Sequence, residues 1–288
     1  MRIELGTAQF GTPYGIANSR GQVKKIEAKN ILDYAKNFGI DTIDTAIAYG
    51  TSEQCLGEIG LDGYQVITKL PEIPADYGNL KKWVQNHIEK SLKNLGIEAL
   101  SGLLLHRPSQ LLDNDKRDLW SLLLQLKAEG YVKKIGYSIY TPDELGELWH
   151  PFKPDLIQAP YSIFDRRLEK SGWLERIYNE NVEIHVRSIF LQGLLLMNKN
   201  NRPKKFNKWL PLWDQWDGWL EESEVTAVQA AVSFALSDNR ITRVIVGVDS
   251  LDQLKEIITA ANRNTNRFPQ DLNVSDITLL NPSEWATL

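Results

Sequence analysis

Four side chains that can hold or move a proton occur in the first third of the chain, each at or just past the end of a short apolar segment: Asp44, Tyr49, Lys69 and His106. The ordinary pKa of a tyrosine is about 10, too high for a good acid at neutral pH, and a neighbouring ammonium can lower it by roughly 1 to 3 units. We therefore expect Lys69 to lower the pKa of Tyr49, and Asp44 to hold Lys69 in place. With His106 hydrogen-bonded to a carbonyl oxygen, the four residues predict a proton-donating site.

Each of these residues alone also fits an ordinary structural role. A lysine or aspartate at a strand end commonly forms an ion pair, a tyrosine before a glycine can be a rim aromatic, and a histidine before Arg-Pro can cap a loop. Their joint placement favours chemistry. The other histidines, His87, His150 and His185, have no such neighbours in the sequence and are interpreted as surface or packing residues.

Eight short apolar segments rich in β-branched residues alternate with longer segments of helical period. This alternation is typical of βαβ units and a parallel sheet. Eight such pairs predict an α/β fold, a (β/α)8 TIM barrel that forms a single domain over residues 1–288. The predicted strands are Ile3–Gly6, Thr42–Asp44, Gln65–Thr68, Gly102–Leu105, Lys134–Tyr137, Leu156–Gln158, Glu183–Val186 and Arg243–Val246.

The carboxyl ends of all strands in such a barrel meet at one rim, which carries the chemistry. Nearly every expected strand end supplies a polar residue or a glycine, which a doubly wound open sheet would not need. In chain order these residues are Thr7, Asp44, Lys69, His106, Ser138, Gln158, Arg187 and Gly247.

Helix ends are marked by glycine and helix starts by capping residues. Helices over residues 24–38, 80–95 and 114–129 are each followed by a glycine, which readily adopts the left-handed conformation of a helix C-terminus. Thr141 and Ser250 have the features of N-caps and predict two further helix starts.

A tryptophan-rich segment is expected as a loop and helix inserted after strand 7, at about residues 198–222. Its tryptophans and leucines follow a helical period and form one apolar stripe, so we expect core packing rather than sugar stacking or partner binding. The polar stretch 198–205 is expected to be a mobile loop on the rim. The four tryptophans are Trp209, Trp213, Trp216 and Trp219.

Composition indicates a globular protein, with 42% hydrophobic and 24% charged residues in a chain of 288. A net charge of -4 and scattered basic pairs argue against nucleic acid as a partner. The single cysteine, Cys55, and the absence of zinc-ligand spacing favour a reducing cytoplasm and no metal. No signal peptide or membrane span is expected, and no motif points to a particular oligomeric state.

The chain resembles the aldo-keto reductases over nearly its whole length. The similarity is carried by Leu5–Thr7, Asp44–Gly50, Thr68–Lys69, Leu105–Pro108, Ile135–Ser138, Ile157–Gln158, Val244–Gly247 and Gln253–Glu256. The resemblance implies that hydride moves from C4 of NADPH or NADH to a carbonyl carbon while Tyr49 protonates the oxygen.

The resemblance also implies a set of cofactor-binding residues. Ser138 and Gln158 would bind the carboxamide, with Gly6, Thr7 and Arg187 nearby. The pyrophosphate would contact Ser188, Leu191 and Gly193, and the adenosine half would lie against Gly247, Val248, Asp249, Ser250, Gln253 and Glu256.

Three positions depart from the family pattern. Ile139 stands where an asparagine usually binds the carboxamide, and Arg187 where many members stack an aromatic ring on the nicotinamide. Asp249 aligns with an arginine that contacts the 2′-phosphate in members that prefer NADPH. A carboxylate would repel that phosphate and could accept a hydrogen bond from a free ribose hydroxyl, so we expect a weakened preference for NADPH.

Features of the substrate side are fewer. Ala8 replaces a bulky tryptophan of many members, and Tyr14, Phe10 and the Trp209 region are expected to line a roomier pocket. The segment Leu5–Asn18 resembles a reductase branch found with surface-polysaccharide synthesis, and this resemblance implies a sugar-derived carbonyl substrate.

Two other functions fit parts of the pattern. A nicotinamide-binding regulatory or scaffolding protein on the same fold would tolerate the departures at Ile139 and Arg187. An isomerase or aldolase using Lys69 as a Schiff-base nucleophile would leave Tyr49 and His106 without a role.

Overall fold

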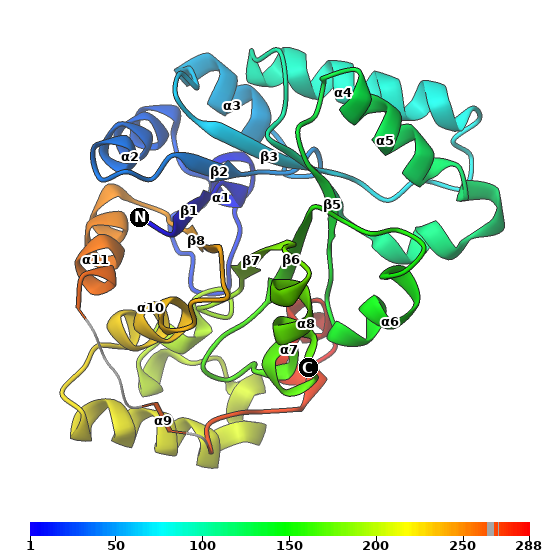
Figure 1. Cartoon of the computed structure of the whole chain (residues 1–288). Coiled ribbons are helices and arrows are strands. Elements are labelled where there is room, and N and C mark those ends of the chain that lie inside the picture. Colours follow the sequence, from blue (N-terminus) through cyan, green and yellow to red (C-terminus); the bar gives the residue numbers. More distant parts are fainter. Residues whose placement is uncertain (264–267, 270) are drawn as a thin grey trace.

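Eight parallel strands form a closed barrel in chain order, and β1 pairs with β8 to complete it (Figure 1). The computed structural model describes residues 1–263, 268–269 and 271–288. The strands are β1 (Ile3–Gly6), β2 (Thr42–Asp44), β3 (Gln65–Leu70), β4 (Gly102–Leu105), β5 (Ile135–Ser138), β6 (Leu156–Pro160), β7 (Glu183–Arg187) and β8 (Arg243–Gly247). The predicted (β/α)8 barrel is confirmed, and the predicted strands agree to within two residues at each end.

Helices cover the outside of the barrel, because the strands are buried on both faces and their apolar side chains need cover (Figure 1). They are α1 (Ala8–Gly11), α2 (Lys25–Asn37), α3 (Ser52–Ile59), α4 (Leu80–Leu95), α5 (Leu119–Ala128), α6 (Leu145–Leu148), α7 (Arg167–Lys170), α8 (Trp173–Asn179), α9 (Leu210–Glu222), α10 (Ala227–Ser237), α11 (Leu251–Ala261) and α12 (Ile277–Leu280). None of the helices in the described part of the chain has the length and apolar character needed to cross a membrane.

The helix boundaries follow local sequence signals with one exception. Gly96 ends α4 in the left-handed conformation, with φ of 67°, and Ser250 begins α11 by accepting a hydrogen bond from the Gln253 amide. The helix predicted over 114–129 instead begins at Leu119, after a short 3-10 turn (Asn114–Lys116) that buries no side chain. Helix packing starts only where an apolar residue meets the core.

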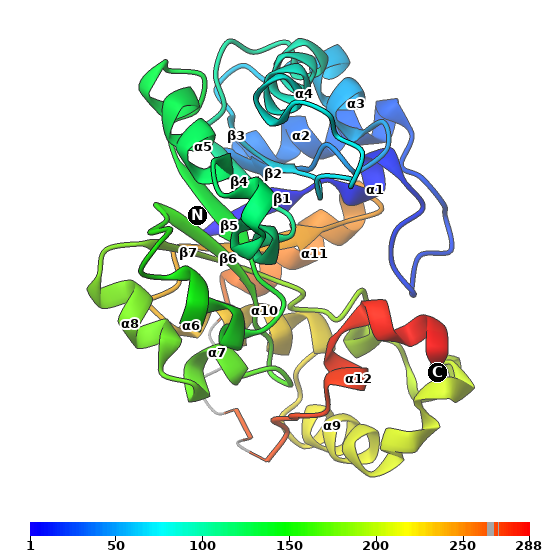
Figure 2. The same cartoon turned by 90° about the vertical axis from the view of Figure 1, so that its right-hand side faces the viewer.

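The tryptophan-rich segment packs as a helix, α9, beside the C-terminal α12 (Figure 2). Trp213 and Trp216 are buried, and the Trp216 Nε1 donates to the Leu195 carbonyl at 3.1 Å, so the prediction of core packing is confirmed. The stretch 198–205 was expected to be a mobile loop but forms 3-10 turns. Ion pairs from Lys199 and Arg202 to acidic residues of α9 hold these turns.

One ion pair lies inside the barrel itself. His185 on β7 and Glu4 on β1 are separated by β8, yet Nδ1 and Oε2 are 2.6 Å apart, so the contact crosses the interior. Burial disfavours the imidazolium, but the carboxylates of Glu4 and Glu183 together outweigh it, and the pKa of His185 is raised to about 9. His185 is therefore a buried charged partner, and its interpretation as a surface or packing residue is wrong.

Candidate active site

Neighbouring strands and the turns after them bring the four proton-handling residues together. Asp44 ends β2, Lys69 lies in β3, His106 follows β4, and Tyr49 stands in the turn between β2 and α3. The turn holding Tyr49 packs directly on α1, where a Cβ on Gly11 would lie 1.7 Å from the Tyr49 carbonyl oxygen. Only glycine fits at this approach, so α1 helps to place the phenol.

A buried hydrogen-bond network holds Lys69 beneath Tyr49. The Lys69 ammonium donates to both carboxylate oxygens of Asp44 at 2.6 and 2.7 Å, and to the Thr45 carbonyl at 2.9 Å. Gln158 Nε2 donates to the same carboxylate at 2.7 Å. Although burial opposes the charge, Asp44 keeps the pKa of Lys69 above its usual value, so the lysine remains an ammonium.

Tyr49 lies above this ammonium and beside the imidazole of His106. The Lys69 Nζ is 5.1 Å from the centre of the Tyr49 ring, and the Tyr49 and His106 rings meet edge to face at 5.9 Å. Burial raises the pKa of Tyr49 by more than Lys69 lowers it, so the prediction of a lowered pKa is wrong in its net direction. Burial, with the charges of Lys69 and Arg187, lowers the pKa of His106 to about 3, which leaves a neutral imidazole.

These residues face a cavity of about 660 Å³ at the carboxyl ends of the strands. Many of the predicted site residues line it: Gly6, Thr7, Asp44, Tyr49, His106, Ser138, Gln158, Arg187, Ser188, Gly193, Gly247, Asp249, Gln253 and Glu256. Four others do not. Lys69 lies beneath the wall, Leu191 and Val248 are buried beside it, and Ser250 caps α11.

At one side of the cavity, Arg187 lies across the ends of β5 and β6. Its guanidinium donates to the Ser138 hydroxyl at 3.3 Å and to the Ile139 carbonyl at 2.9 Å. Ser138 in turn donates to Gln158 Oε1 at 3.3 Å. The two departures at Ile139 and Arg187 are thus joined, because the arginine bonds the backbone of the isoleucine.

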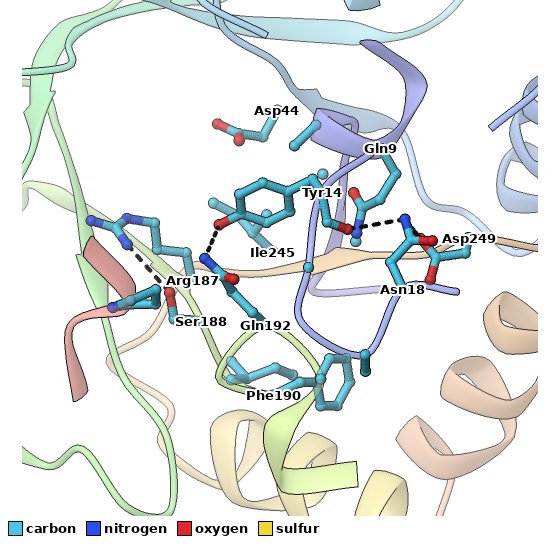
Figure 3. Close-up of a pocket in the computed structure, with 18 of the residues that line it drawn as sticks. Gln9, Tyr14, Asn18, Asp44, Arg187, Ser188, Phe190, Gln192, Ile245 and Asp249 are labelled. Carbon is cyan, nitrogen blue, oxygen red and sulfur yellow. Dashed lines mark hydrogen bonds between the residues drawn. The ribbon is translucent and has the colours of Figure 1, made fainter. Parts of the chain in front are cut away.

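At the opposite side, Asp249 lies before α11, and Tyr14 projects between it and Arg187 (Figure 3). Asn18 donates to the Asp249 carboxylate at 3.2 Å, which brings the loop between α1 and α2 against the start of α11. The first amide of that helix, Leu251 N, donates to the Glu27 carboxylate at 2.7 Å. Neither Asn18 nor Glu27 was predicted to be a site residue: Asn18 ends the segment that resembles one reductase branch, Glu27 lies in no motif, and only the fold brings them here.

Of the residues predicted to line the substrate side of the cavity, some lie in its wall and others do not. Ala8 and Tyr14 line the cavity, whereas Phe10 is fully buried and Trp209 packs in the core, so the expectation that they form its wall is wrong. The C-terminal residues Asn281, Pro282 and Ser283 and the loop residue Gln192 line the cavity and were missed. No cluster of residues suited to a metal ion occurs in the ranges that the structure describes.

Comparison with known proteins agrees with this geometry. Residues 2–270 match the profile of the Aldo/keto reductase family. The chain is 26% identical over 294 residues to L-glyceraldehyde 3-phosphate reductase of Escherichia coli O157:H7, covering 87% of this chain and 84% of that protein. It is 25% identical over 298 residues to NADH-specific methylglyoxal reductase of Escherichia coli K12, covering 91% and 90%. An aldo-keto reductase from Bacillus halodurans, solved in its holo form, superposes with a TM-score of 0.72 at 22% identity, covering 92% and 88%.

Proposed function

The chain belongs to the aldo/keto reductase family and is an NAD(P)-dependent oxidoreductase. We propose that it reduces an aldehyde or ketone to an alcohol, with Tyr49 as the proton donor. The observation that carries the proposal is the buried Lys69 ammonium, 5.1 Å from the Tyr49 ring and fixed by Asp44. A positive charge under a phenol stabilises the phenolate that remains once the proton has left.

Each residue of the site has a separate task. Tyr49 keeps its proton in the resting enzyme because burial raises its pKa, and it releases the proton only as negative charge grows on the carbonyl oxygen. His106, as a neutral imidazole, donates a hydrogen bond to the same oxygen without competing as an acid. Asp44 accepts a hydrogen bond from the Lys69 ammonium and so holds it beneath the Tyr49 ring.

The residues present fit a nicotinamide dinucleotide. The cavity runs from neutral hydrogen-bonding groups at Ser138 and Gln158 to the start of α11, an eleven-residue helix. Gly193 and Gly247 keep its wall free of side chains, since a Cβ on either would lie within 2.6 Å of a neighbouring side chain. When bound, the reduced nicotinamide supplies the hydride. Ser138 and Gln158 would hold its carboxamide, and the residues from Gly247 to Glu256 its adenosine half.

We further propose that NADH is used at least as well as NADPH. Asp249 and Glu27 place two carboxylates at the start of α11, and Glu27 already accepts the amide hydrogen of Leu251. Burial raises the pKa of Asp249, an effect that the Gln253 hydrogen bond and Arg20 oppose. Fluorescence titration is expected to give similar dissociation constants for both cofactors or a lower one for NADH. NADPH bound at least tenfold tighter than NADH would contradict the proposal.

The test of the activity is a panel of small aldehydes, ketones and sugar-derived carbonyls with both cofactors. Sugar-derived carbonyls belong in the panel because the small side chain of Ala8 lines the cavity where many members of the family carry a bulky tryptophan. With C4-deuterated cofactor, deuterium is expected on the carbinol carbon of the product. Cofactor binding without turnover of any carbonyl would instead favour a regulatory protein. Borohydride trapping of a ketose on Lys69 would favour a Schiff-base enzyme.

A further inference from the structure

Arg187 brings a positive charge into the cavity wall at the end that holds Tyr49 and His106. Its three hydrogen-bond acceptors are the hydroxyls of Ser138 and Ser188 and the carbonyl of Ile139, at 3.3, 3.2 and 2.9 Å. All three are neutral. Within the described ranges no carboxylate forms an ion pair with this guanidinium, so its charge is not neutralised by the protein.

A second guanidinium strengthens this charge. The Tyr140 ring lines the cavity, with Arg187 4.9 Å from its centre and Arg107 4.5 Å from it. Arg107 is exposed and likewise has no ion-pair partner among the residues described. Both guanidinium charges act on His106, because they add to the effect of burial and of Lys69 in lowering its pKa.

The positive charge is local. The chain as a whole carries a net charge of -4, and the Lys69 ammonium is neutralised by Asp44. Two further acids line the cavity, Asp249 just before α11 and Glu256 in the middle of that helix, and Figure 3 shows Asp249 on the opposite side from Arg187. The Arg187 guanidinium is partly buried at the cavity wall, and an anionic ligand in the cavity would supply the counter-ion that the protein does not.

We propose that the substrate is an anionic carbonyl compound whose carboxylate or phosphate binds Arg187 while Tyr49 and His106 hold its carbonyl oxygen. The planar guanidinium presents paired N–H donors that match both kinds of oxyanion. Arg107 adds to the attraction from behind the Tyr140 ring. The inference rests on the proposed carbonyl reduction and deepens it by naming the class of substrate.

The experiment compares matched charged and neutral carbonyls with saturating NADH. One pair is 4-oxobutanoate and its methyl ester, and the other is glyceraldehyde 3-phosphate and glyceraldehyde, so the two arms distinguish a carboxylate from a phosphate. Wild-type protein is expected to favour the charged member of at least one pair by tenfold or more in kcat/KM. Arg187→Gln is expected to reduce that ratio at least tenfold, and Arg187→Lys to reduce it less. Arg117→Gln, an exposed arginine in the same β4–α5 segment as Arg107, is the control.

Binding supplies a readout besides turnover. Calorimetric titration of the NADH complex with succinamate and with neutral succinamide is expected to show tighter binding of the anion, lost in Arg187→Gln. Equal use of charged and neutral members by wild-type protein would overturn the inference and leave carbonyl reduction intact. The inference would also fall if Arg187→Gln weakened NADH binding but left the charged-to-neutral ratio unchanged, because the arginine would then serve the cofactor. Turnover of no carbonyl at all would contradict the proposed function instead.

Discussion

At the residue scale, burial and one ammonium set the proton chemistry of Tyr49 and His106. Burial keeps the phenol protonated and the imidazole neutral, while Lys69 lies where it would stabilise the phenolate that the proposed reaction forms. The direction of the Tyr49 shift could not be predicted from the sequence, because the sequence names Lys69 as a neighbour but does not show how fully the phenol is removed from water.

Because His106 is neutral, we expect kcat/KM to stay nearly constant as the pH falls below 7. Because the pKa of His106 is about 3, kcat/KM for an uncharged aldehyde is expected to change by no more than about twofold between pH 7 and pH 5. Steady-state kinetics over this range, with the exposed-histidine variant His150→Gln as control, would measure it. A fall with an apparent pKa between 6 and 7 that disappears in His106→Gln would contradict a neutral imidazole.

At the element scale, strand ends and helix starts carry the site, and these were largely predictable. Alternating apolar segments located all eight strands, and the capping role of Ser250 was readable from local sequence. The contacts of Asn18 with Asp249 and of Glu27 with Leu251 were not predictable, because each joins residues more than 200 positions apart, the first through a loop and the second through the packing of α2 against α11. The prediction that Phe10 lines the cavity was wrong for the same reason: the sequence does not show which distant residues bury its side chain.

The start of α11 predicts how cofactor preference can be altered. Asp249→Asn is expected to increase the affinity for NADPH relative to NADH by about tenfold, since it removes a negative charge facing the proposed 2′-phosphate position. Glu27→Gln is expected to act in the same direction, with a smaller effect. Dissociation constants from tryptophan fluorescence would measure both. Asp252→Asn, an exposed acid in the first turn of α11, is the matched control, and an equal shift in it would contradict a specific role for Asp249.

The helix α9 is expected to stabilise the fold through its buried tryptophans. Trp216 is fully buried, bonds the Leu195 carbonyl and meets Phe164 edge to face at 5.7 Å. Trp216→Ala is therefore expected to lower the free energy of unfolding by about 3 to 5 kcal/mol. The partly buried neighbour Trp219, which stacks on Trp216, provides a comparison whose alanine variant should cost clearly less. Chemical denaturation giving equal losses for the two variants would argue against core packing of this helix.

At the scale of the whole molecule, the barrel separates a buried ion pair in its interior from the reactive rim. Glu4 and His185 link β1 to β7 across the interior, whereas the cavity lies at the carboxyl ends of the strands. The barrel itself followed from the sequence, since eight strand and helix pairs leave few other arrangements. The interior pair did not, because no local pattern distinguishes an inward histidine from a packed one.

The interior pair predicts a loss of stability at alkaline pH. The pKa of His185 is about 9 in the folded protein and 6.5 in the unfolded chain, so the folded state binds more protons between these values. The stabilisation is complete below pH 6.5 and is lost as pH rises through 9. Urea unfolding is expected to show wild-type protein losing on the order of 2 kcal/mol more than Glu4→Gln/His185→Gln between pH 6.5 and pH 9. Equal losses in the two proteins would show that the pair does not retain its proton.

The role of Tyr49 as proton donor is tested by the single-turnover rate of NADH oxidation by a reactive aldehyde in wild-type protein and in Tyr49→Phe. The variant removes only the phenolic hydroxyl and leaves the Lys69–Asp44 pair and the cofactor wall in place. We expect the variant to have an NADH dissociation constant within about threefold of wild type and a rate lower by at least 100-fold, the usual contribution of a positioned acid. Equal rates in the two proteins would contradict Tyr49 as the proton donor.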